Sequence, residues 1–196
     1  MLQVKFIAHV DRAKCSGCKL CEKVCLTDTI KVVNKVAVVD DDCLGCTRCV
    51  DICWHDEAVV MVPRPTPRYV GTDVNEVDAE QVRGLCAQAH RLPGELVCVC
   101  ANTSAGEIAA AIIKGARSFK ELSFATGVLQ GCQEFCVPPI QRMLKVKGVD
   151  VTKAGGFLKY DQTLSMWDIP KAAQERFEYH FAEDLALATK SREGGE

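Results

Sequence analysis

The residues of this 196-residue chain best suited to chemistry are its thirteen cysteines, eight of which form two identical runs. Each run reads C-x-x-C-x-x-C-x-x-x-C, and the second begins 28 positions after the first. Three closely spaced thiolates can hold three corners of a cubane iron-sulfur cluster, while the fourth, beyond a wider gap, binds the neighbouring cluster. The runs therefore predict two [4Fe-4S] clusters, one held by Cys15, Cys18, Cys21 and Cys53 and the other by Cys43, Cys46, Cys49 and Cys25.

On these cysteines, residues 1–62 resemble the bacterial-type two-cluster ferredoxins, a family of small electron carriers. That family usually has proline after the fourth cysteine of each run, where this chain has Leu26 and Trp54. Residues around the sulfurs tune the reduction potential, so the departure bears on the potential and leaves the ligands intact.

Alternating apolar residues predict an opening strand over residues 4–10, a hairpin of residues 30–33 with 36–39, and a closing strand over 59–62. The internal repeat makes two pseudo-equivalent halves, so we expect an α+β, ferredoxin-like pseudo-twofold module around two clusters. About sixty residues bury little apolar surface, and the clusters should therefore form part of the core.

A disulfide scaffold and structural zinc are the alternatives for these eight cysteines. Residues 1–10 lack the cationic start and long apolar stretch of an export signal, which favours reduced thiols in the cytoplasm. The wider third spacing, which binds a neighbouring cluster, has no use in a zinc site.

A second set of cysteines has a different spacing: Cys98-x-Cys100, then Cys132-x-x-x-Cys136. Four thiolates suit a [2Fe-2S] cluster, and a closed tetrahedral zinc site is the alternative. Between the pairs, Ser104 and Ser118 each precede a glutamate by three residues, which predicts two capped helices. Pro138 and Pro139 predict a third helix that begins beside the cysteines and ends at Gly148.

The C-x-C pair, the helical spacer and Gly131 before the second pair resemble the bacterioferritin-associated ferredoxins, or BFD-like [2Fe-2S] domains, over about residues 96–148. That family usually has two residues between its last two cysteines, and this chain has three. The resemblance implies a small all-helical domain that exchanges electrons with a flavoprotein subunit.

The rest of the chain predicts a linker, a further helix and a tail. Prolines 63, 65 and 67 predict an extended linker over residues 63–77, or else a surface loop on the first module. A helix capped by Asp78 should bury Cys86 as a core thiol and open a domain over residues 78–148.

Residues 149–196 should form an extended segment and a C-terminal helical arm from Pro170, which packs on its own domain or docks another subunit. The arm's apolar stripe comprises Ala173, Phe177, Phe181, Leu185 and Ala188.

Several functional classes find no support in the sequence. The net charge is -2 with acids and bases interleaved, which gives no case for nucleic acid binding, and no apolar run is long enough for a membrane-spanning helix. No nucleotide-binding glycine motif or nucleophile elbow occurs. The histidines His9, His55, His90 and His180 share no ligand spacing, although His55 could donate a hydrogen bond near Cys53.

We therefore expect a non-catalytic, electron-transfer subunit of an oxidoreductase complex. It would relay single electrons between a flavin-containing or other catalytic partner and a soluble carrier such as a ferredoxin. The alternative is an independent redox-sensing or iron-handling ferredoxin module, with zinc or [2Fe-2S] at the second set of cysteines.

Overall fold

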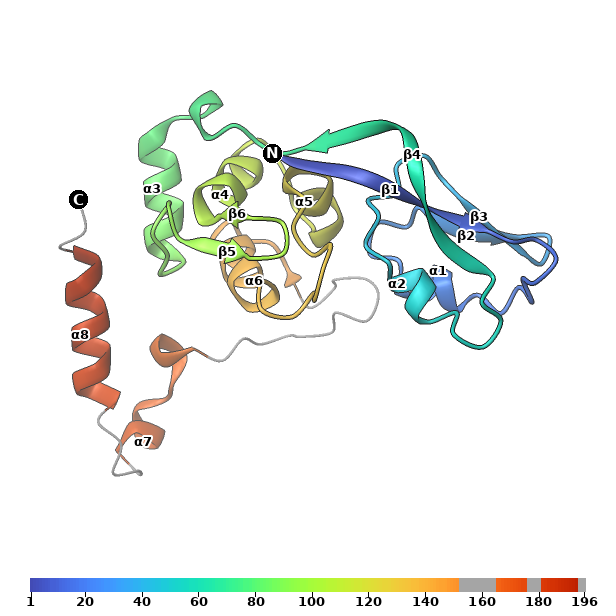
Figure 1. Cartoon of the computed structure of the whole chain (residues 1–196). Coiled ribbons are helices and arrows are strands. Elements are labelled where there is room, and N and C mark those ends of the chain that lie inside the picture. Colours follow the sequence, from blue (N-terminus) through green and yellow to red (C-terminus); the bar gives the residue numbers. More distant parts are fainter. Residues whose placement is uncertain (152–164, 176–180, 194–196) are drawn as a thin grey trace. The chain divides into compact units, whose positions relative to one another are not determined.

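The computed structural model describes residues 1–151, 165–175 and 181–193 (Figure 1). The chain divides into two compact units, Met1–Asp161 and Gln162–Glu196. All thirteen cysteines belong to the first unit, and none of them forms a disulfide. The first unit is mixed α and β, with strands in two-stranded sheets.

The first unit begins with a long antiparallel ribbon of two strands, β1 (Leu2–Val10) and β4 (Val59–Val70) (Figure 1). Leu2 pairs with Val70 at one end and Val10 with Val59 at the other. Alternate residues of a strand face opposite sides, and accordingly Val4 and Ala8 are buried while their neighbours are more exposed. The strands expected over residues 4–10 and 59–62 are confirmed, but both continue further.

The proline-rich stretch expected as a linker is, in its first part, the second half of β4. The register between β1 and β4 shifts between Val4 and Phe6, where Arg68 and Pro63 are the respective partners, so residues 64–67 bulge opposite Lys5. Proline lacks a backbone N–H and is tolerated in strands at edges and bulges, which explains how three prolines fit here. Residues 63–70 of the extended linker expected over residues 63–77 therefore belong to strand β4.

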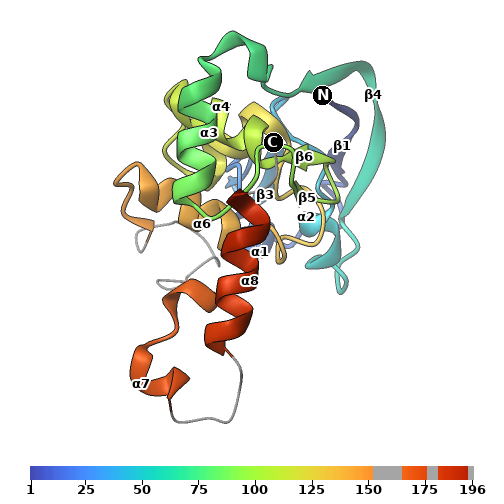
Figure 2. The ribbon, with the colours of Figure 1, turned by 90° about the vertical axis from the view of Figure 1, so that its left-hand side faces the viewer.

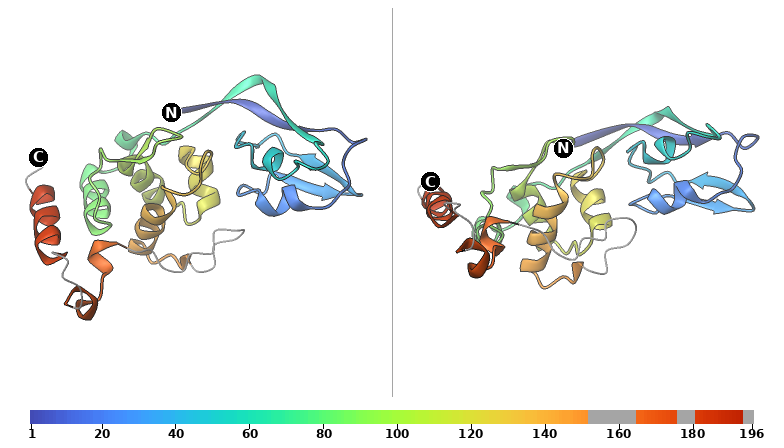
Figure 3. Two further views of the ribbon diagram at one scale, coloured as in Figure 1. Left: turned by 60° about the horizontal axis from the view of Figure 1, so that its bottom comes forward. Right: turned by 90° about the horizontal axis from the view of Figure 1, so that it is seen from below.

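A hairpin and two short helices complete the N-terminal module, the name used below for residues 1–70. The hairpin pairs β2 (Ile30–Val33) with β3 (Val36–Val39), as expected. Figure 3 shows it beside α1 (Leu20–Val24) and α2 (Arg48–Asp51), which also contact each other. The backbone repeats at the sequence interval: Gly17 and Gly45 have φ of 70° and 73°, and Lys19 and Thr47 both have φ of 65°. The pseudo-twofold relation of the two halves stays a prediction.

The core of the N-terminal module is small and rich in sulfur. One cluster of buried side chains combines three cysteines with four aliphatic residues: Ala8, Cys21, Ile30, Ala37, Cys43, Cys49 and Val59. Four aliphatic side chains bury little apolar area, so apolar burial alone stabilises this module only weakly.

The helical domain, residues 74–151, follows β4. Its elements are η1 (Val74–Glu76), α3 (Ala79–Gln88), β5 (Leu96–Cys98), β6 (Thr103–Ser104), α4 (Ala105–Ile113), α5 (Phe119–Thr126) and α6 (Val137–Val146). Helices α3 and α4 lie side by side in Figures 1 and 2 and make the most contacts of any helix pair in the described residues. The expectation of an all-helical domain was wrong in one respect, because Leu96–Cys98 pairs with Thr103–Ser104 to form a small hairpin.

The expected helix signals of this domain are confirmed. Asp78 accepts the backbone N–H of Gln81 at the start of α3, and Ser118 caps α5, which ends at Gly127 with φ of 75°. The core holds the expected apolar faces, including fully buried Cys86, Ile108, Ile140 and Met143. Burial raises the pKa of the Cys86 thiol to about 11, in keeping with an inert core thiol.

We expect Ser104→Ala to destabilise the helical domain by about 1 kcal/mol, because α4 would lose its N-terminal cap. Ser104 Oγ accepts the Glu107 N–H at 3.2 Å, and the Glu107 carboxylate accepts the Ser104 N–H at 2.9 Å. Urea unfolding followed by far-ultraviolet circular dichroism measures the change. An unaltered unfolding midpoint would contradict this role.

The second unit contains η3 (Met166–Asp168), α7 (Lys171–Gln174) and α8 (Phe181–Glu193) (Figure 2). The continuous helix expected from Pro170 to about Lys190 was wrong, because α7 ends at Gln174 and Glu175 lies in a turn. Ala173, Phe181, Leu185 and Ala188 of the expected stripe are half-buried, and Phe177 lies outside the described residues. Whether this arm docks another subunit stays a prediction. No helix in the described ranges is long and apolar enough to span a membrane.

Candidate functional site

Four cysteines from both runs line one cavity of the N-terminal module, here called cavity A. They are Cys15, Cys18, Cys21 and Cys53, together with Val32, Ala37, Ile52 and Val59. The space not filled by protein atoms measures about 320 Å³, open solvent included. Three thiols come from the first run and one from the second, which is the set that the spacing predicts.

The complementary four cysteines, Cys25, Cys43, Cys46 and Cys49, line a second cavity, here called cavity B. It measures about 350 Å³ on the same basis, and Ala8, Ile30, Val39 and Met61 contribute its apolar wall. Thiols and aliphatic groups thus make up much of both cavity walls, and polar side chains such as Asp56 at cavity A and Arg48 at cavity B complete them. The structure brings together each expected set of four, and their role as cluster ligands stays a prediction.

Glycines with left-handed backbone let the cysteine loops approach the strands. A Cβ on Gly17 would lie 2.5 Å from the Lys35 carbonyl oxygen, and one on Gly45 would lie 2.8 Å from that of Phe6. The close approach aligns the backbone N–H of Ala37 with Cys15 Sγ at 3.4 Å. Gly17 therefore fits its cysteine loop against the turn between β2 and β3, and Gly45 fits its loop against β1.

Burial makes the thiolate forms of these cysteines costly. It raises the pKa of Cys21 to about 11 and that of Cys49 to about 12, and repulsion from neighbouring thiolates adds to both. Four thiolates in an apolar cavity are stable only beside compensating positive charge, which iron supplies. The donor set and the space thus fit a multinuclear iron group.

Cys25 has two threonine hydroxyls beside its sulfur, which the sequence did not reveal. The Thr27 and Thr29 hydroxyls each lie 3.6 Å from Cys25 Sγ, and both threonines are buried. Burial opposes the thiolate, but hydrogen bonds from Thr29 and Thr27 and from the backbone N–H groups of Thr29 and Ile30 lower the pKa of Cys25 below its ordinary value. Short polar residues two and four positions after the cysteine were the available signal.

Arg64 is a second residue that the sequence did not single out. Its side chain is 5% exposed and donates to the carbonyl oxygens of Asp41 and Cys43 at 2.5 and 2.6 Å. Arg64 therefore holds the loop that carries Cys43. Its position between two prolines indicated a linker, so only the pairing of β4 with β1 reveals its structural role.

The two departures from the ferredoxin pattern have different surroundings. Leu26 is half-buried and packs against the core of the helical domain, whereas Trp54 is 74% exposed. The Trp54 ring meets the His55 ring edge-on at 5.7 Å between centroids. His55 Nδ1 lies 3.1 Å from an Asp56 carboxylate oxygen, and no hydrogen bond from His55 to a sulfur is present among the described residues.

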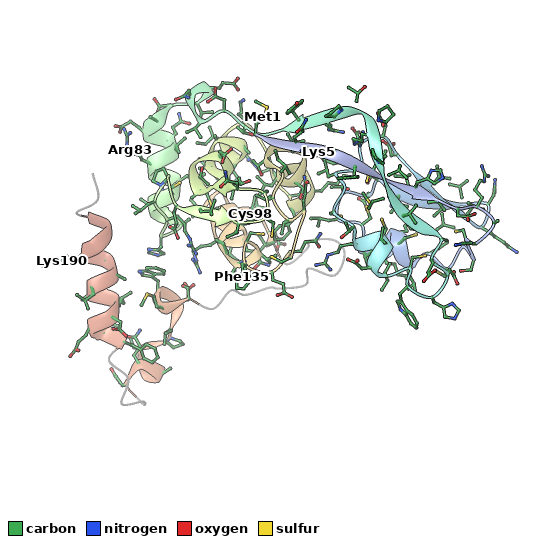
Figure 4. The ribbon with its side chains drawn as sticks, viewed as in Figure 1. Met1, Lys5, Arg83, Cys98, Phe135 and Lys190 are labelled. Carbon is green, nitrogen blue, oxygen red and sulfur yellow. The ribbon has the colours of Figure 1, made fainter. Side chains whose placement is uncertain are left out.

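The other four cysteines meet in the helical domain, at what is called here the helical-domain site. Cys98 ends β5 and Cys136 is the N-cap of α6, and both are 2% exposed, whereas Cys100 and Cys132 are exposed. Figure 4 shows Cys98 among α4, α5 and α6. The thiol of Cys136 donates to Cys98, which lowers the pKa of Cys98 and raises that of Cys136. The backbone N–H of Cys132 points at Cys100 Sγ, 3.5 Å away. The expected quartet is therefore brought together.

Backbone N–H groups surround the sulfurs of this site. Those of Glu134 and Phe135, just before α6, contact Cys132 and lower its pKa. The N–H of Leu129 contacts both Cys98 and Cys136. Leu129 is 1% exposed with a left-handed φ of 67°, a strained conformation for a branched residue that aims its N–H at the sulfurs. Amide donors of this kind stabilise negative charge on sulfur.

Gly131, which precedes the second cysteine pair, lies directly against Cys100 of the first pair. A Cβ there would lie 2.5 Å from both Cβ and Sγ of Cys100. The absent side chain lets the chain turn from the end of α5 to Cys132 while remaining against the first cysteine pair.

Apolar side chains flank the exposed cysteines of this site. Val99, between the first pair, is 74% exposed, and Phe135, within the three-residue spacing of the second pair, is 82% exposed. Figure 4 shows Phe135 on the loop beside α6. Exposed apolar surface therefore adjoins both exposed cysteines of the site.

Single metal ions have different requirements from clusters. In residues 1–151, 165–175 and 181–193, no three His, Cys, Asp or Glu side chains are placed to hold a single metal ion. His9 and His55 are exposed, His90 is half-buried, and His180 lies outside the described residues.

Comparison with known families identifies the class of one part of the chain. The model of the BFD-like [2Fe-2S] binding domain matches residues 96–146, which contain Cys98, Cys100, Cys132 and Cys136. The chain thus contains an iron-sulfur domain of this kind, as its spacing predicts. No solved structure matches the chain.

Proposed function

We propose that this chain is an electron-transfer subunit that holds one [2Fe-2S] cluster in the helical domain and two [4Fe-4S] clusters in the N-terminal module. The observation that carries the proposal is the sorting of twelve cysteines into three groups of four, two of which line separate cavities. When bound, such clusters accept and release one electron each without a protein-derived proton.

The chain's own residues do the rest. Thiols hold the iron, aliphatic walls keep water from the cavities, and backbone N–H groups together with Thr27 and Thr29 stabilise negative charge on sulfur. The proposed role is relay, because two of the three groups of four cysteines line cavities that suit a cofactor. The catalytic step would belong to a partner subunit.

The proposed partner is a flavoprotein subunit that contacts the helical-domain site, with a soluble ferredoxin as the outer carrier. Val99 and Phe135 support this, because they are exposed beside the two exposed cysteines of the site. An aromatic side chain of this exposure is a suitable anchor for a protein interface.

We expect Phe135→Ser to weaken the association by about 2 kcal/mol, or roughly 30-fold, as for loss of an aromatic anchor. The measurement is the flavin recovered per chain when the tagged full-length protein is purified anaerobically from its native cells. Val33→Ser, at a 53% exposed position in β2, is the matched control. Equal flavin recovery from Phe135→Ser and the unaltered chain would contradict the anchor.

The same purification separates electron relay from an independent redox sensor. A relay subunit should copurify with flavin in fixed stoichiometry. A chain that carries iron and sulfide but is recovered alone would favour the sensor, and would refute the proposed partner.

A further inference from the structure

Arg48 joins the two cofactor-binding regions of the chain. It lies between Cys46 and Cys49 at the start of α2, and it helps to line cavity B. Its backbone N–H contacts the sulfur of Cys46. Its guanidinium Nη2 donates to the backbone carbonyl oxygen of Cys132 at 3.2 Å. A single residue therefore connects a thiol of cavity B to a cysteine of the helical-domain site.

Two neighbouring contacts hold the same side of the module against the helical domain. Leu26, which follows Cys25 of cavity B, packs against the helical-domain core. Lys120 of α5 pairs with Asp28 at 3.2 Å. Leu26 adjoins Cys25 and Arg48 adjoins Cys49, the first and the last of the four cysteines that line cavity B. The helical domain is therefore contacted next to both of these cysteines.

The corresponding positions around cavity A differ in chemistry. The repeat places Leu20 at the position of Arg48 and Trp54 at that of Leu26. Leu20 is 43% exposed and Trp54 is 74% exposed. The duplicated motif has thus diverged at both positions, with a cation and a packed leucine at cavity B and exposed apolar groups at cavity A.

We propose that Arg48 is a positioning residue that makes cavity B the inner site, coupled to the helical-domain site, and leaves cavity A as the outer site. The proposal rests on the proposed function, because the coupling concerns groups held by these cysteines. Arg48 fixes the loop of Cys132 relative to Cys46, and its charge stabilises added negative charge at both sites. Arginine suits this role because its fork-shaped guanidinium donates to the Cys132 carbonyl oxygen while the backbone N–H of the same residue contacts the Cys46 sulfur.

The experiment measures the midpoint potential of the [2Fe-2S] electron paramagnetic resonance signal in the anaerobically purified full-length chain. Arg48→Gln should shift this potential downward and reduce the broadening of the signal that appears when neighbouring centres are also reduced. Arg48→Lys retains the positive charge but lacks the fork-shaped guanidinium. Its midpoint potential should therefore stay close to that of the unaltered chain, whereas part of the broadening should be lost. Leu20→Gln, at the repeat-related position, should change neither.

Iron content separates the possible failures. If the unaltered chain lacked the [2Fe-2S] signal, the proposed function itself would fail. If all variants retained iron but Arg48→Gln left potential and broadening unchanged, or Leu20→Gln changed them equally, only the inner-site assignment would be overturned. If Arg48→Gln lost iron, Arg48→Lys would decide, and unaltered broadening there would refute the positioning role.

Discussion

Cys53→Ala is expected to abolish the [4Fe-4S] signal of cavity A and to leave that of cavity B, although Cys53 belongs to the second run. Cys53 lines cavity A with Cys15, Cys18 and Cys21. A cubane cluster uses four thiolates, so removal of one should release up to about four of roughly ten iron atoms per chain. Iron and sulfide analysis with low-temperature electron paramagnetic resonance measures the loss.

Two variants serve as comparisons for Cys53→Ala, which tests whether the second run supplies a ligand to cavity A. Cys25→Ala should affect cavity B instead, since Cys25 lines it with Cys43, Cys46 and Cys49. Cys86→Ala should leave the iron content unchanged, because that thiol is buried in the helical core away from both cavities. Loss of the cavity B signal from Cys53→Ala would contradict the arrangement.

Gly131→Ala should remove most of the [2Fe-2S] cluster while the [4Fe-4S] signals persist. The new methyl group would lie 2.5 Å from Sγ and Cβ of Cys100, so the loop or the cysteine must move. Overpacking of this kind costs about 2 kcal/mol, or roughly a 30-fold loss of affinity at a site that requires fixed sulfurs. Visible absorption and iron content measure the loss.

Gly84→Ala is the matched control for the glycine substitution. Gly84 lies within α3, and a Cβ there would meet nothing within 4 Å. Alanine should stabilise the helix by about 0.5–1 kcal/mol and leave cluster content unchanged. Retention of the full [2Fe-2S] signal by Gly131→Ala would show that the loop tolerates a side chain.

The features that were predictable from sequence are those fixed by short-range chemistry. Ser104, Ser118 and Asp78 cap helices through bonds to residues three positions on, so a local pattern suffices. The cysteine groups join distant parts of the chain, and they follow from the ligand spacing of cluster motifs rather than from local contacts. Gly131 was also predictable, because a small residue beside a ligand indicates close approach of the backbone.

The features that were not predictable depend on long-range pairing. Arg64 and the prolines indicated a linker, but β1 pairs with β4 on both sides of the bulge and makes that stretch part of a strand. The hairpin of β5 and β6 has strands too short to give a periodic signal. The contact of Arg48 with Cys132 joins residues 84 positions apart, and only the folded chain reveals it.

The most direct test of three iron-sulfur sites is the iron and acid-labile sulfide content of anaerobically purified chain, with electron paramagnetic resonance of its reduced form. Three groups of four cysteines predict about ten iron and ten sulfide per chain, with both [4Fe-4S] and [2Fe-2S] signals. About eight iron with one zinc would contradict the assignment of the helical-domain site. A folded chain without iron or sulfide would contradict the whole account.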